Sequence, residues 1–178
     1  MVVRTALAAV LRAASPSALI AQDTPATDTA APADIVPQVR SRDLTGTFGG
    51  QRVAYTATVK GNVLFSDDGT KPEAVIVTTS YVANPRDTSR PVFFLFNGGP
   101  GSGSVWLQMG AFGPKRVAIP GDARDDGAPP YPILDNPDSL LDVADLVFID
   151  PPGTGFSYLT EGTDPQKYYG LTQDARAV

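Results

Sequence analysis

The sequence has 178 residues, and its 42% hydrophobic and 19% charged content is typical of a globular domain rather than a disordered chain. A formal net charge of −5, with no Lys/Arg cluster longer than two residues, argues against a nucleic-acid partner. The chain contains no cysteine and no histidine, so a disulfide framework is excluded and a zinc or transition-metal site is not expected. A mechanism with an imidazole base cannot be completed by this chain alone.

The N-terminal residues are expected to precede the folded domain. Residues 1–22 contain two arginines, no carboxylate and a short apolar stretch, which favours an export signal and a periplasmic or secreted location. A misplaced start codon or a disordered tail is the alternative. Residues 23–40 are rich in Ala, Thr, Pro and Asp, which predicts a disordered linker. No stretch approaches the ~18 consecutive apolar residues that a membrane span requires.

Strand patterns begin after the expected linker. Residues 52–60 alternate broadly between apolar and polar side chains, as a half-buried strand does. Gly61-Asn62 is expected to interrupt this strand before the apolar residues 63–65. A run of turn residues, 66–70, then precedes a β-branched run over residues 73–82. Two or three antiparallel strands are therefore predicted.

The second half of the chain alternates strands with glycine loops. Residues 92–96 (VFFLF) predict a fully buried strand, followed by a loop of three glycines and a proline. Apolar residues at helical spacing over 105–112 predict a short helix with Trp106 in the core. Another buried strand, residues 145–150, ends in a second glycine loop over 151–158. This order predicts an α/β fold with ligands at the carboxyl ends of the strands.

Two stretches lie between that short helix and the second buried strand. Residues 120–138 are rich in Gly, Pro and Asp and predict a surface insertion, because the stretch is long for a structureless loop. Residues 139–144 predict a brief helical turn.

The first glycine loop could serve chemistry or simply turn the chain. Glycines permit close approach of the backbone, and a rigid loop of exposed N–H groups can hold a developing oxyanion. A plain tight turn is the alternative for Gly-Gly-Pro-Gly by itself. Nucleotide binding is disfavoured, since Tyr158 stands where a dinucleotide fingerprint needs its third glycine and no Gly-Lys-Ser/Thr follows either loop. No cofactor is expected.

Three polar residues beside these loops have competing interpretations. Asp150 ends a strand, where catalytic acids are often placed, but a carboxylate accepting backbone N–H bonds from the Pro-Pro-Gly turn is the favoured interpretation. Ser102 and Ser104 lie outside any G-x-S-x-G nucleophile elbow, a motif that the chain lacks. A helix N-cap is their simplest role.

The two glycine loops together resemble the serine carboxypeptidase family, its bacterial members in particular. The resemblance covers about residues 48–178 and is strongest over 91–114 and 139–158. The segments that carry it are Asn97-Gly98-Gly99-Pro100-Gly101-Ser102, Gly113-Pro114, Ala144-Asp145-Leu146-Val147-Phe148-Ile149-Asp150-Pro151 and Gly153-Thr154-Gly155-Phe156-Ser157-Tyr158.

The resemblance implies an α/β-hydrolase fold and a serine-type carboxypeptidase that removes C-terminal residues from peptides. Residues 41–178 would form an incomplete α/β-hydrolase domain, with antiparallel N-terminal strands leading into a mostly parallel sheet. By resemblance, the backbone N–H of Gly99 would form half of the oxyanion hole. Asn97 and the backbone of Gly98 would bind the free C-terminal carboxylate of a peptide, which is the expected partner.

The sequence also departs from the family pattern. Leu95 stands where many eukaryotic members have Trp, and Ala111 stands where they have a Glu that helps to bind the substrate carboxylate and favours acidic pH. The nucleophile, Asp and His of the family's triad are absent, so the chain is expected to be an inactive N-terminal portion of the enzyme. A non-catalytic peptide-carboxylate binding fragment and part of another α/β-hydrolase, such as an esterase, are the alternatives.

Overall fold

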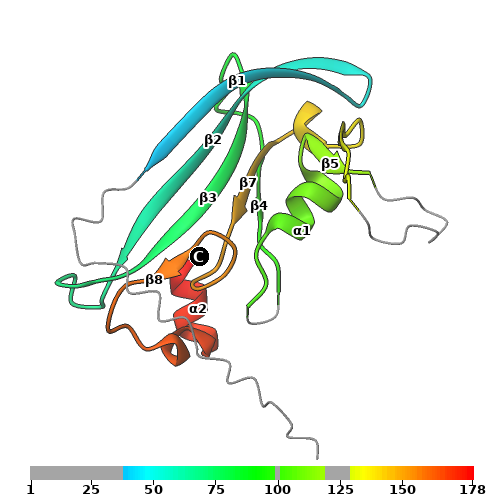
Figure 1. The fold of residues 1–178 in the computed structure, drawn as a ribbon. Helices are drawn as coiled ribbons and strands as arrows, with labels where there is room; N and C mark the ends of the chain where they lie inside the picture. Colours follow the sequence, from blue (N-terminus) through cyan, green and yellow to red (C-terminus); the bar gives the residue numbers. More distant parts are fainter. Residues whose placement is uncertain (1–37, 99–100, 119–128) are drawn as a thin grey trace, which may run out of the picture.

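The computed structural model describes residues 38–98, 101–118 and 129–178, so the predicted export signal and nearly all of the predicted linker lie outside the described residues. Its main feature is a six-stranded sheet in the order β1-β2-β3-β7-β4, with β8 paired to β3 (Figure 1). In chain order the elements are β1 (Val39–Phe48), β2 (Gln51–Phe65), β3 (Pro72–Asn84), β4 (Val92–Leu95), α1 (Val105–Leu107), the π-helical η1 (Gln108–Phe112), β5 (Lys115–Val117), β6 (Ile133–Asp135), the 3-10 helix η2 (Leu140–Asp142), β7 (Asp145–Ile149), β8 (Tyr158–Leu159), the 3-10 helix η3 (Pro165–Tyr169) and α2 (Leu171–Ala177).

The first three strands form an antiparallel meander. The sequence predicts the antiparallel pairing of β2 and β3 but not β1, whose first residues, Val39 and Arg40, stand where the linker is expected. Gly49 and Gly50 join β1 to β2 with φ angles of 53° and 79°, a left-handed turn that suits a tight hairpin. The predicted interruption at Gly61-Asn62 is wrong, because β2 continues through it. The Asn62 side chain donates hydrogen bonds to the Ile76 carbonyl and the Thr78 hydroxyl of β3, at 3.2 and 3.3 Å, and so stabilises the pairing there.

The C-terminal side of the sheet contains one parallel pair among the described strands. β7 pairs antiparallel with β3 and parallel with β4, and the other described ladders are all antiparallel. The expected mostly parallel sheet is therefore not seen in this part of the chain. Strands joined by tight hairpins must run antiparallel, and only the long connection from β4 through α1 and η2 to β7 allows a parallel pair.

Alternate residues of β7 face two separate cores. Leu146 and Phe148 lie in a cluster with Phe48, Tyr55 and Leu141, against which α1 and η1 pack. Ile149 belongs to a second cluster, with Ala74 and Ile76 of β3. Four rings from four strands (Phe48, Tyr55, Tyr81 and Phe148) form a chain of edge-on contacts with centroid separations of 5.8, 6.1 and 5.9 Å. Such contacts add to area burial and fix β1, β2, β3 and β7 against each other.

The strand β4 differs from its prediction. It was expected to be fully buried, but its Phe93 and Phe94 side chains are exposed, Phe94 to 64%. The reason is its place in the sheet: β4 is the last strand of the order, and among the described strands it pairs with β7 alone. An apolar strand sequence predicts a strand, whereas its burial depends on what covers it.

The connection from β4 to β7 contains the predicted helical segments. The helix expected over residues 105–112 is present as α1 continuing into η1, and the turn expected over 139–144 contains η2. Part of the predicted insertion, residues 120–128, lies outside the described residues. The rest includes β6, which pairs antiparallel with β5.

Candidate functional site

The two glycine loops meet beyond the carboxyl ends of β4 and β7. Because these strands are parallel, their carboxyl ends lie at the same edge of the sheet, where α/β proteins place ligands. A Cβ on Gly103 would lie 2.9 Å from the Cα and 3.0 Å from the N of Gly155, closer than real side chains come. The backbones therefore touch at these glycines, and no larger residue fits.

Asp150 bonds to both loops. Its Oδ1 accepts hydrogen bonds from the backbone N and the Oγ of Ser104, at 2.7 and 2.8 Å, and its Oδ2 accepts from the backbone N of Phe156 at 2.9 Å. The side chain is buried, with the residue 6% exposed. The prediction that Asp150 accepts backbone N–H bonds is confirmed. Its donors, however, are Ser104 and Phe156 rather than the Pro-Pro-Gly turn.

The sequence-predicted carboxylate-binding residues follow β4 directly. Asn97 is half-buried, and its Nδ2 donates a hydrogen bond to the Oγ of Ser102 at 2.5 Å, across the loop. Gly98 is exposed. Gly99, the predicted oxyanion-hole residue, lies outside the described residues. The structure thus brings Asn97 and Ser102 together.

Two sequence-based interpretations of the next segment are corrected. Ser104 occupies the N-cap position of α1, but its side chain makes no capping bond and donates to Asp150 instead. Trp106 was expected in the core and is 70% exposed. Its neighbour Leu107 is the α1 residue that packs against the core cluster. Helical spacing cannot tell which side of so short a helix meets the sheet.

The second loop is fixed by a serine that the sequence analysis did not single out. The Oγ of Ser157 donates to the Asp150 carbonyl at 2.7 Å and accepts from the Val77 N of β3 at 2.8 Å. Gly155 has a φ of 54°, and a Cβ there would lie 2.2 Å from the Asp150 carboxylate. Ser157 is part of the motif that carries the family resemblance, and that was the signal available in the sequence.

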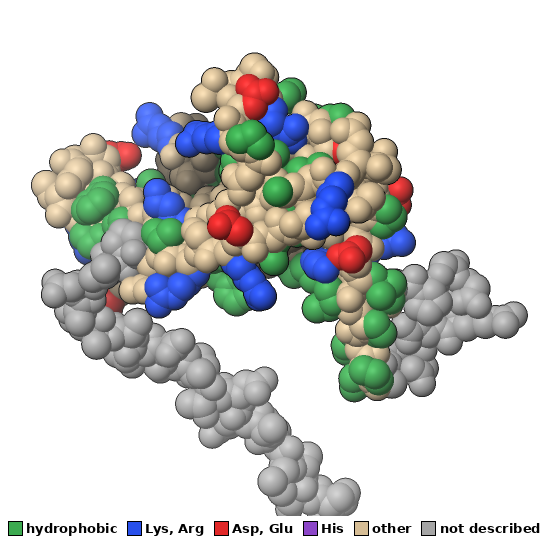
Figure 2. Space-filling model, turned by 90° about the horizontal axis from the view of Figure 1, so that it is seen from above, with side chains coloured by type: hydrophobic (Ala, Val, Ile, Leu, Met, Phe, Trp, Pro, Cys, Tyr) green, Lys and Arg blue, Asp and Glu red, His purple; other side chains and the backbone are tan. Residues whose placement is uncertain are grey.

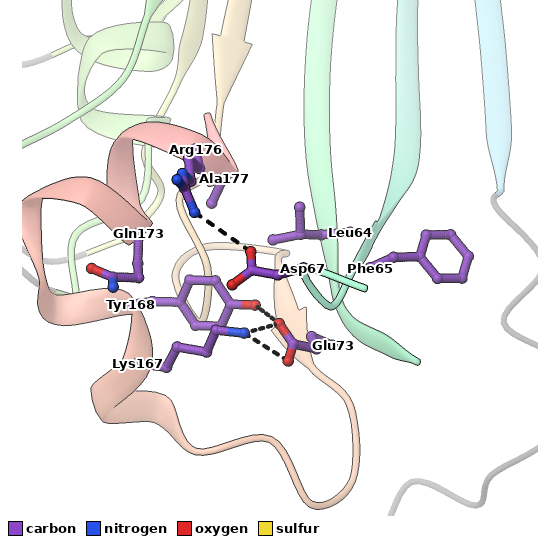
Figure 3. Close-up of a pocket in the computed structure, with 9 residues that line it drawn as sticks. All are labelled: Leu64, Phe65, Asp67, Glu73, Lys167, Tyr168, Gln173, Arg176 and Ala177. Atoms are coloured by element: carbon purple, nitrogen blue, oxygen red, sulfur yellow. Dashed lines mark hydrogen bonds and ion pairs between the residues drawn. The ribbon is translucent and has the colours of Figure 1, made fainter. Parts of the chain in front are cut away.

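A separate pocket of about 40 Å³ lies between the β2–β3 turn and α2 (Figure 3). Lys167 Nζ donates to both Glu73 carboxylate oxygens, at 2.7 and 2.6 Å, and Tyr168 OH donates to Oε2 at 2.8 Å. The Lys167 ammonium lowers the pKa of Glu73, and Glu73 in turn raises the pKa of Lys167. Burial first, then the bond to Glu73, raises the pKa of Tyr168.

The charged groups of this pocket are already paired. Besides the Glu73–Lys167 pair, Arg176 of α2 lies 3.6 Å from Asp67 in the β2–β3 turn (Figure 3). The volume has room for only about one or two water molecules. We therefore assign this pocket a structural role, fastening η3 and α2 to the sheet.

Comparison with known proteins decides the family. A family model described as serine carboxypeptidase matches residues 79–177, which is more than half of the chain and includes both glycine loops. The chain belongs to the serine carboxypeptidase family. A search of curated proteins gives no match.

The two departures from the serine carboxypeptidase pattern lie on either side of the first loop. Leu95 ends β4 and packs against the core cluster. Ala111 lies exposed in η1, and its carbonyl accepts a hydrogen bond from the buried Asn136 Nδ2 at 2.7 Å. Asn136 also donates to the Gly113 carbonyl at 2.8 Å, so it fixes the end of η1. The sequence analysis missed this residue, which stands in a run of turn-forming residues.

The rest of the described surface adds few further candidates. Over residues 38–98, 101–118 and 129–178, no group of three or more His, Cys, Asp or Glu could hold a metal ion. Within the same ranges, no helix has the length and apolar content to cross a membrane. Figure 2 shows Lys and Arg side chains spread over one face, with acidic groups among them.

Proposed function

We propose that this chain supplies the substrate-binding part of a serine-type carboxypeptidase with an α/β-hydrolase fold, which releases C-terminal residues from peptides. The observation that carries the proposal is the contact between the two family-specific loops: Gly103 packs on Gly155, and Asp150 bonds to both. Family membership supports the reaction type. The position of both loops at the carboxyl ends of parallel strands supports a ligand site there.

We assign recognition of the substrate carboxylate to Asn97 and Gly98. An amide NH₂ group has two N–H donors, and Ser102 takes one of them, so the other can serve a carboxylate oxygen. Gly98 is exposed, so a peptide can approach its backbone N–H closely. Hydrogen bonds from these donors to an ionised carboxylate are stronger than bonds between neutral groups.

We assign oxyanion stabilisation to the backbone N–H of Gly99, by resemblance to the family. Attack of a serine hydroxyl on the terminal peptide carbonyl places a negative charge on the carbonyl oxygen, and an aligned N–H lowers the energy of that state. The hydroxyl needs a base to take its proton. Since the sequence contains no histidine and no G-x-S-x-G elbow, we propose, by resemblance to the family, that the histidine, the nucleophile and the triad Asp are supplied by residues outside it.

A second candidate is a non-catalytic module that binds peptide carboxylates. The absence of histidine favours it, because binding needs only the donors of the first loop. Both candidates predict that the chain binds peptide carboxylates. They differ once the nucleophile, the triad Asp and the histidine are supplied, because only the carboxypeptidase would then hydrolyse the peptide.

The test is binding of an N-blocked dipeptide with a free C-terminal carboxylate, compared with its C-terminal amide, by calorimetry or NMR titration. The amide should bind about tenfold or more weakly, because hydrogen bonds to a charged group are lost. Asn97→Ala should weaken binding of the acid by a similar factor. Asn84→Ala, which removes an amide that bonds to Thr56 at the far end of β3, is the matched control.

Equal binding of the acid and the amide would overturn the assignment of Asn97 and Gly98. The same chain should show no hydrolysis of the dipeptide. Turnover that a serine-directed reagent abolishes would contradict the placement of the nucleophile outside this sequence.

A further inference from the structure

We propose that Asp150 is a positioning residue that couples the two glycine loops, so that the second loop sets the geometry of the substrate-binding loop. The inference rests on the proposed function, since it concerns the loop that carries Asn97 and Gly98. It assigns Asp150 no contact with substrate and no proton transfer. Its role is to hold the segment that ends the first loop.

The bonds to Asp150 tie the loops to one buried charge. Among the described residues its donors are the N–H and O–H of Ser104 in the first loop and the N–H of Phe156 in the second. No lysine or arginine is among them. Separation of either loop would leave a buried carboxylate with fewer donors, which is unfavourable because burial has removed its water. The charge therefore holds both loops at once.

The coupling extends from Ser104 back to Asn97. Gly103, next to Ser104, lies in backbone contact with Gly155, so this stretch cannot shift toward the second loop. Ser102, the preceding residue, accepts the hydrogen bond from the Asn97 amide. Asp150 thus reaches the proposed carboxylate-binding side chain through the short segment 102–104 and one hydrogen bond.

The other end of β7 provides a matched control. Asp145 is also a buried aspartate, 7% exposed, and it accepts bonds from the Ala83 N at 3.0 Å and the Arg90 Nε at 3.2 Å. Its partners belong to β3 and to the connector before β4. Substitution of Asp145 should lower the stability of the sheet without acting on the glycine loops.

The experiment is hydrogen exchange of the full 178-residue chain, read by mass spectrometry for segments 101–104 and 151–157. Asp150→Asn keeps the shape of the side chain but replaces one acceptor oxygen with an NH₂ donor. We expect exchange in segment 101–104 to become roughly tenfold faster, which is the size of effect from losing a hydrogen bond to a charged group. Asp145→Asn should leave unchanged the ratio of the exchange rate in segment 101–104 to the exchange rate in the rest of the sheet.

Ser104→Ala tests the coupling in the opposite direction and is available if Asp150→Asn does not fold. It removes one of the three bonds and keeps the Ser104 N–H donor. Because coupling between two sites is reciprocal, exchange should also rise in segment 151–157, by a smaller factor. A rise confined to segment 101–104 would overturn the proposal.

Two further outcomes would overturn the proposal. One is that Asp150→Asn speeds exchange in segment 151–157 alone. The other is that Asp145→Asn raises the exchange rate of segment 101–104, relative to the rest of the sheet, as much as Asp150→Asn does. Dipeptide binding separates this inference from the proposed function. If the wild-type chain does not distinguish acid from amide, the proposed function fails, and exchange still decides the coupling. If the wild-type chain binds the acid more tightly than the amide, Asp150→Asn should weaken binding of the acid severalfold, and Asp145→Asn should not.

Discussion

At the scale of single residues, Glu73 makes the stability of the chain depend on pH. Lys167 donates to both of its carboxylate oxygens, and the pKa of Glu73 is lowered in the folded state. A lowered folded pKa means that the stabilisation is complete above the unfolded value of about 4.3 and is lost as the pH falls through the folded value. The raised pKa of Lys167 acts in the opposite direction, at alkaline pH.

Glu73→Gln should therefore lower the melting temperature most near neutral pH. Below a pH of about 4 the difference in melting temperature between the variant and the wild type should shrink. The wild-type Glu73 carboxyl then becomes protonated and is neutral, as glutamine is. Thermal melts between neutral and acidic pH measure this, with Glu161→Gln, an exposed residue of the loop before η3, as the control. A difference that stays constant with pH would show that the ion pair is not its cause.

At the scale of elements, the contact between the two loops is sensitive to added volume. Gly103→Ala would place a methyl group 2.9 Å from the Gly155 Cα, and both neighbours are backbone, so the loops must move apart. We expect a loss of about 1–3 kcal/mol in the free energy of unfolding, the usual range for overpacking. Urea denaturation measures it.

Gly110→Ala is the matched control for that substitution. A Cβ on Gly110 meets nothing within 4 Å, and the residue lies in η1. Because alanine is the better helix former, the change should be neutral or stabilising by up to about 1 kcal/mol. Equal losses at the two positions would show that the close approach of the loops is not what makes Gly103 sensitive.

Helices and strands were more predictable from the sequence than the burial and the hydrogen-bond partners of their side chains. The strand patterns over residues 52–65 and 73–82, the helix over 105–112 and the strand over 145–150 follow from local periodicity, and all are present, whereas β1 was not predicted. Burial of Phe94 and Trp106 was predicted wrongly, because it depends on which element covers each side chain. The donors to Asp150 could not be predicted either, since Ser104 lies 46 residues away along the chain.

At the scale of the whole molecule, we expect the edge strand β4 to govern solution behaviour. An edge strand offers unpaired backbone groups to other chains, and here it also exposes the aromatic side chains Phe93, Phe94 and Phe96. We expect the chain to bind apolar dyes and to associate as its concentration rises.

Phe94→Lys should reduce both effects, because a lysine on an edge strand opposes pairing with a second strand. Phe65→Lys, at the end of β2, replaces another exposed phenylalanine and is the control. Light scattering against concentration, together with dye fluorescence, measures the difference. Equal effects of the two substitutions would point to general hydrophobicity rather than to the β4 edge.

The bond between Ser104 and Asp150 also has a consequence for how the chain is made. Translation produces the first glycine loop before Asp150, whose carboxylate bonds to the end of that loop and lies 46 residues after Ser104 in the sequence. A nascent chain that has not yet emerged beyond β7 therefore contains every residue of that loop without the partner that fixes it. The first glycine loop is therefore synthesised early, but it can be fixed in place only after Asp150 has been added to the chain.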